Sequence, residues 1–151
     1  MQGVNIQYMG ALLFHLQHSY GSSLARVTTS QFCQMYIRPF TSRSRTSLVH
    51  VLTPENDNTT QLTGQASWFI SHTWANPIED TIMAVFSLLN PLCERTFVWF
   101  DVMSTSQHEM AGPSKPSSWW MKTFKESIAR IGGVVLVVDA WDRPSALQRA
   151  W

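Results

Sequence analysis

One stretch of the chain constrains its fold more than any other: a short apolar run that ends in polar residues and leads into a helix start. Residues 68–70 (Trp-Phe-Ile) are bulky or β-branched, which is typical of a buried strand. Residues 71–73 (Ser-His-Thr) follow, and then Asn76, Pro77 and Glu79 provide a helix cap, a first-turn proline and an acidic third position. This succession indicates an open parallel α/β sheet, in which ligands bind at the carboxyl ends of the strands.

The same pattern recurs further along the chain. Two more apolar runs each end in an aspartate, Asp101 and Asp139, and helical periodicity separates the runs. The expected elements are, in order, strand 67–70, helix 77–89, strand 96–100, loop 103–118, helix 118–131, strand 133–138 and a helix from Pro144. Because crossovers between parallel strands are right-handed, the three strands lie side by side in one sheet. We predict an α/β domain over residues 64–151, incomplete at its C-terminal end.

The preceding residues, 1–63, are predicted to form an N-terminal helical extension and linker. Apolar spacing favours helices over 4–18 and from Thr29 to Arg38, where Pro39 would end the second. Residues 46–52 fit a short strand or a helical turn, and 54–63 a loop. Residues 1–50 hold four arginines and no acidic residue. That composition is shared with organelle transit peptides, but we interpret the segment as an extension that packs on the domain.

Composition excludes several classes of function. A chain of 151 residues suits one domain with a real core. The net charge of +1 gives no electrostatic basis for binding nucleic acid or an anionic membrane, and no apolar run is long enough to span a bilayer. The two cysteines have no metal-ligand spacing and are typical of free thiols in a reducing compartment. We therefore expect a cytoplasmic protein without a metal site.

Polar and indole side chains follow each of the three predicted strands. Since parallel strands end at the same edge of a sheet, we expect these side chains to gather on one rim. The candidate site residues are Ser71, His72, Thr73, Trp74, Asp101, Asp139 and Trp141. A polar cluster bordered by tryptophans suits a small planar ligand.

The residues alone do not determine which reaction, if any, this rim performs. Ser71 and His72 are neighbours whose side chains should diverge, and the glycines of a nucleophile elbow are absent, which argues against a Ser-His-Asp triad. Asp101 lacks the additional acidic residues that would hold Mg²⁺ for phosphoryl transfer. No glycine-rich phosphate loop follows the first strand. His72 either takes part in catalysis or hydrogen-bonds to the loops and fixes the edge.

Several short motifs resemble those of Toll/interleukin receptor (TIR) domains, and more closely those of a divergent TIR-like group in protist, algal and fungal proteins. The motifs are Phe-Ile-Ser-His-Thr-Trp from Phe69, Trp-Phe-Asp from Trp99, Trp-Trp-x-x-x-Phe from Trp119, Thr-Thr-x-x-Phe-Cys from Thr28, and Pro-Ser-Ala-Leu-Gln-Arg-Ala-Trp from Pro144. The similarity covers about residues 28–151. It implies a flavodoxin-like TIR fold, used for self-association in signalling or for cleaving the nicotinamide–ribose bond of NAD.

The resemblance also implies what this chain would lack. In the enzymes of the family, the essential glutamate follows a Trp-Cys-x-x-Glu run, and Trp151 matches that tryptophan. We therefore expect no NAD hydrolysis by this chain and an open, apolar edge on strand 133–138 that invites a partner. Three hypotheses remain open: a TIR-like domain with a nucleotide-type cleft, a self-association module using the edge and loop 103–118, and a fragment of a longer enzyme whose frame continues past Trp151.

Overall fold

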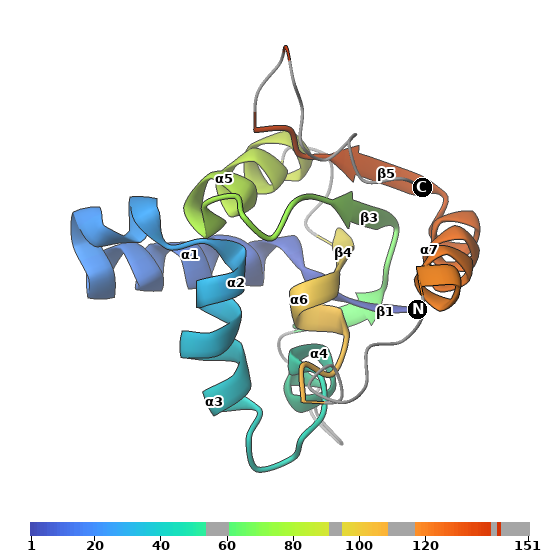
Figure 1. The fold of residues 1–151 in the computed structure, drawn as a ribbon, viewed down its shortest axis with the longest axis horizontal. Helices are drawn as coiled ribbons and strands as arrows, with labels where there is room; N and C mark the ends of the chain where they lie inside the picture. The colour runs from blue at the N-terminus through green and yellow to red at the C-terminus, as the bar shows by residue number, and fades with distance from the viewer. Residues whose placement is uncertain (54–60, 91–94, 109–116, 140–141, 143–151) are drawn as a thin grey trace.

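The structure, a computed structural model, describes residues 1–53, 61–90, 95–108, 117–139 and 142 of the chain. Helices pack around a single sheet, so the fold is a mixed α/β one (Figure 1). The elements are β1 (Gln2–Asn5), α1 (Ile6–Tyr20), η1 (Gly21–Arg26), α2 (Thr29–Phe32), η2 (Cys33–Ile37), α3 (Arg38–Phe40), α4 (Leu48–Leu52), β2 (Thr63–Gln65), β3 (Trp68–Ser71), α5 (Ile78–Leu89), β4 (Phe97–Phe100), α6 (Asp101–Ser104), α7 (Ser117–Ile131) and β5 (Gly133–Leu136).

The described strands form one five-stranded sheet in the order β2-β1-β4-β3-β5. The three predicted strands are β3, β4 and β5, and they are parallel as expected: Phe69 pairs with Trp99 on one side and with Val134 on the other. The sheet as a whole is mixed, however, because β1 runs antiparallel to both β2 and β4. The predicted all-parallel sheet is therefore correct for three strands and incomplete for the remainder.

Apolar side chains cover both faces of the central strands, which explains why these runs read as continuously apolar. On one face, Ile70 and Phe100 pack with residues of α1 and α5 in the larger core. On the other face, Phe69 and Trp99 stack with ring centroids 4.8 Å apart and pack against Ile131 at the end of α7. Figure 1 shows α7 on the side of the sheet away from α1.

Residues before position 63 contribute to this same sheet as well as forming helices. β1 is an interior strand whose Val4 is fully buried opposite Val98. The predicted helix 4–18 exists as α1, but it begins at Ile6, where Asn5 caps it by accepting from the Gln7 amide. Burial raises the pKa of Tyr8 to about 12, and the nearby Tyr36 of η2 adds to the effect. The segment expected as a helical extension is thus tied to the core through β1 and α1.

The second predicted helix continues past the proline that was expected to end it. Proline lacks the amide hydrogen that an α-helix needs and crowds the preceding turn. Before Pro39 the chain widens into the π-helical turn η2, in which the Arg38 amide donates to the Cys33 carbonyl. The expectation that Pro39 stops the helix is therefore wrong, because η2 accommodates the proline and α3 extends to Phe40.

Three further expectations are settled by the structure. Residues 48–52 are the helical alternative, α4, which Ser47 caps. The expected loop 103–118 begins inside a helical turn, α6, so residues 103 and 104 are not loop. Asn76 is not the side-chain cap of α5: Pro77 holds the cap position, and the Asn76 side chain accepts a hydrogen bond from Thr73. The predicted helix from Pro144 and half of loop 103–118 lie outside the described residues.

Candidate functional site

The carboxyl ends of β3 and β4 meet, as the sequence predicts, and bring their polar residues together. The parallel register aligns Ile70 with Phe100, so the residues that follow each strand leave the sheet at the same level. His72 Nδ1 lies 3.8 Å from Asp101 Oδ1, and the His72 ring packs edge-on against Phe100 at 4.7 Å between centroids. His72 is buried, whereas the Asp101 side chain is 17% exposed. The aspartate is thus the more accessible member of the pair.

Asp101 joins three segments of the chain. Its Oδ2 accepts a hydrogen bond from the Trp74 indole at 2.8 Å, and its Oδ1 accepts one from the Val102 amide at 2.7 Å. Its main-chain carbonyl accepts hydrogen bonds from Thr105 Oγ1 and Gln107 Nε2. Both carboxylate oxygens therefore have protein donors, so Asp101 holds the β3 and β4 exits in place.

The loop after β3 is closed by its own side chains. Thr73 Oγ1 donates to Asn76 Oδ1, and the Asn76 amide donates to the Thr73 carbonyl. Ser71, Thr73 and Asn76 are all buried. The polar tip of β3 is therefore directed into the protein, and Trp74, half-buried, forms its outer boundary.

The start of α2 covers this loop. The Thr29 amide donates to the Asn76 carbonyl at 2.9 Å, the Ser30 amide donates to the Trp74 carbonyl at 3.0 Å, and the Ile78 amide donates to the Val27 carbonyl at 2.9 Å. The capping box between Thr28 and Gln31 fixes the beginning of α2 at this point. Because these contacts use main-chain groups, the side-chain pattern of the sequence gives no sign of them.

Cys33 lies under the same rim. Its Sγ is 3.7 Å from Gln107 Oε1, and it is buried. Burial raises the pKa of the Cys33 thiol to about 11, with the nearby Asp101 carboxylate adding to the effect and Arg38 opposing it. A thiol in this state is protonated at neutral pH and is not a nucleophile.

The raised pKa of Cys33 makes stability depend on pH in the alkaline range. The folded thiol keeps its proton up to about pH 11, whereas an unfolded thiol loses it near about 8.5. The unfolded state therefore binds fewer protons between these values, and stability falls as pH rises through them. Between about pH 8.5 and 10.5, we expect the free energy of unfolding to fall less in the Cys33→Ala variant than in the parent. The difference between the two decreases should be on the order of 2 kcal/mol. Urea denaturation at a series of pH values measures both slopes, and equal slopes would contradict this assignment.

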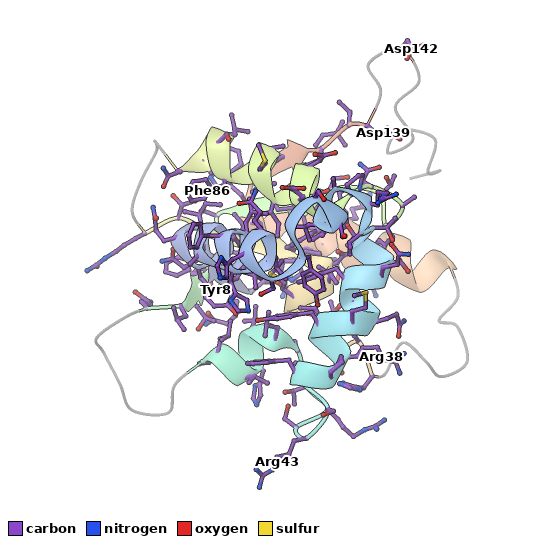
Figure 2. All side chains as sticks on the ribbon, turned by 90° about the vertical axis from the view of Figure 1, so that its left-hand side faces the viewer. Tyr8, Arg38, Arg43, Phe86, Asp139 and Asp142 are labelled. Atoms are coloured by element: carbon purple, nitrogen blue, oxygen red, sulfur yellow. The ribbon has the colours of Figure 1, made fainter. Side chains whose placement is uncertain are left out.

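The seven candidate residues reach different positions. His72, Trp74 and Asp101 come together, and Ser71 and Thr73 are buried beside them. Asp139 is exposed after β5, and Figure 2 shows it with Asp142 at one end of the molecule, opposite Arg43. Trp141 lies outside the described residues. Sequence reasoning missed Gln107, which links Cys33 to Asp101, and the cover supplied by Val27–Ser30.

Two features are absent from the part of the chain that the structure describes. In that part of the chain, no three His, Cys, Asp or Glu side chains are grouped so that they could hold a metal ion. None of the helices described has the length and apolar character needed to cross a membrane.

Comparison with known proteins identifies no relative. The chain matches no family model, no curated protein and no solved structure.

Proposed function

We propose that this chain is a TIR-like interaction domain that acts by binding further copies of itself. The order β4-β3-β5, with β3 first in the chain, is that of the first three strands of a flavodoxin-like sheet, and this supports the fold that the motifs suggest. The polar groups at the strand ends bond one another: Asp101 to Trp74, and Thr73 to Asn76. Polar groups that hydrogen-bond to one another stabilise the strand ends, and they are less available for catalysis on NAD.

The observation that carries the proposal is the character of β5. Among the described strands, β5 ends the sheet, and its sequence, Gly-Val-Val-Leu, contains no charge and no proline. Val134, Leu136 and Val138 are 43%, 41% and 36% exposed. Natural edge strands are usually protected by charge, proline or a bulge, and an unprotected edge pairs readily with another strand. Antiparallel pairing of β5 with β5 of a second copy places Val134 opposite Leu136 and buries both.

Self-association through β5 is tested by the mass of the purified chain over a range of concentrations. We expect the average mass to rise with concentration, to be insensitive to NAD, and to fall when Leu136→Lys places a charge on the edge. Val51→Lys is the matched control, since Val51 is exposed to a similar degree (38%) on α4. If light scattering after gel filtration gives Leu136→Lys the same mass as the parent, the chain does not associate through the β5 edge.

Nucleotide binding at the rim is a second candidate, favoured by the partial exposure of Trp74 and Asp101. An indole beside a carboxylate suits a base and a ribose hydroxyl, with Ser71, His72, Thr73, Asp139 and Trp141 as further lining candidates. A thermal-shift titration with NAD and ADP-ribose tests it, since a ligand that binds the folded state raises the melting temperature. We expect no release of nicotinamide from NAD; release that His72→Ala abolishes would establish the hydrolase instead.

A further inference from the structure

A second surface of the molecule, formed by α1 and α5, has an apolar centre and is uncharged over most of its length. We name it the α1–α5 face. Its exposed members are Gln7, Ala11, Phe14, Gln17 and His18 of α1 and Met83 of α5. Phe14 is 73% exposed and Met83 48%, both larger exposed fractions than any in β5. Large apolar side chains exposed together mark an interaction surface more often than a solvated face.

Contacts between the two helices fix how this face is built. Gln17 Nε2 donates to Glu79 Oε1 at 2.8 Å near one end, and Gln7 Nε2 donates to Asn90 Oδ1 near the other. α1 and α5 are therefore antiparallel neighbours, as Figure 1 shows. Gly10 lies against the Phe86 ring between these two bonds; in Figure 2, Phe86 lies above α1 and Tyr8 below it.

Helical spacing then places Phe14 and Met83 at the same level. Residues 7, 10, 14 and 17 form one stripe of α1, and residues 79, 83, 86 and 90 form the facing stripe of α5. Phe14 lies between Gly10 and Gln17 in the first stripe, and Met83 between Glu79 and Phe86 in the second. The two side chains form the apolar centre of a strip that is about 15 Å long from Gln7 to Gln17 and has a polar pair at each end.

The charge of this face selects its partner. α1 contains no Asp, Glu, Lys or Arg over its 15 residues, and the acidic residues of α5, Glu79 and Asp80, lie in its first turn. A two-fold interface places a surface against its own copy, so every charge near the axis meets a like charge. A neutral surface avoids that repulsion, and antiparallel packing keeps the two acidic turns at opposite ends.

We infer that the α1–α5 face binds the same face of a second copy of this chain, with Phe14 as its central anchor. Aromatic side chains near the middle of an interface, surrounded by weaker contacts, commonly carry most of the binding energy. The inference rests on the proposed self-association but uses residues separate from β5. Two different two-fold contacts on one chain join copies into assemblies larger than a dimer.

Two single variants and their combination test this inference. In the chain with both contacts, light scattering should show a mass greater than that of a dimer at high concentration. The Phe14→Glu variant should form a dimer that is joined through β5. The Leu136→Lys variant should form a dimer that is joined through the α1–α5 face, and the double variant should be a monomer. We expect Phe14→Glu to weaken its contact at least about 30-fold. Phe40→Glu is the matched control, because Phe40 is 51% exposed on α3, outside the face.

The outcomes separate the two proposals. An unchanged mass in Phe14→Glu overturns the inference and leaves the β5 contact standing. An unchanged mass in Leu136→Lys, with a monomer in Phe14→Glu, overturns the β5 contact and supports the face. A chain that is monomeric at every concentration overturns both. Circular dichroism and melting temperature confirm folding of each variant, and the milder Phe14→Ser should weaken assembly in the same direction.

Discussion

Replacement of Asp101 with alanine should destabilise the folded chain by about 2–5 kcal/mol. The carboxylate accepts hydrogen bonds from the Trp74 indole and the Val102 amide, and it lies 3.8 Å from His72 Nδ1. Val102 is fully buried, so its amide cannot turn to water in place of the lost acceptor. Each buried donor left without an acceptor costs about 1–3 kcal/mol, and two are affected here.

Thermal and urea denaturation measure the effect of this substitution. For a chain of this size, we expect the melting temperature to fall by about 5–15 °C. Asp101→Asn keeps one acceptor oxygen but directs an amide group toward a donor, so its loss should be smaller than that of alanine. Asp142→Ala is the control, because Asp142 is exposed and its removal should change stability by less than about 0.5 kcal/mol. If Asp101→Ala is as stable as the control, the carboxylate does not hold the strand ends together.

This prediction also bears on function. A catalytic aspartate is commonly held at some cost to stability, so that its removal leaves the fold unharmed. Asp101 has the opposite character, since its hydrogen bonds connect the exit of β3, the start of α6 and the segment around Gln107. A large loss of stability in Asp101→Ala would therefore support the interaction domain over an enzyme at this rim.

The part of the fold that the sequence predicts well is the part in which local pattern and long-range packing agree. The stripe of α5 and the apolar runs of β3 and β4 are each buried by the sheet, so their periodicity is visible in the residues alone. The meeting of His72 and Asp101 follows directly from parallel register. These elements needed no knowledge of the remainder of the chain.

The part that the sequence does not predict depends on partners distant along the chain. β1 is four residues long and includes Gly3, so it carries no alternating pattern and is defined only by pairing with β2 and β4. The Val27–Ser30 cover of the site uses main-chain hydrogen bonds, which leave no mark on side-chain type. Asn76 satisfied the rule for a helix cap, but its bond to Thr73 was the better alternative in the folded loop.

Replacement of Gly3 with valine should destabilise the chain by a similar amount, and it tests whether the first residues belong to the sheet. A Cβ atom at Gly3 would lie 2.5 Å from the Val98 carbonyl oxygen and 2.7 Å from its carbon, both of which are backbone atoms of β4. Backbone held in a sheet cannot move aside without breaking the ladder, so β1 and β4 would have to separate. We expect a loss of at least about 3 kcal/mol, the upper end of overpacking effects.

The matched control for Gly3→Val is Gly21→Ala. Gly21 has a positive φ of 54° with ψ −140°, but nothing lies within 4 Å of an added Cβ, so its substitution should cost only about 1–3 kcal/mol of backbone strain. Urea denaturation followed by tryptophan fluorescence and by far-ultraviolet circular dichroism measures both variants. If β1 is an interior strand, Gly3→Val shifts both transitions together, because one cooperative unit contains the sheet and α1. A Gly3→Val variant within about 1 kcal/mol of the parent would show that residues 2–5 pair with the sheet too weakly to stabilise it.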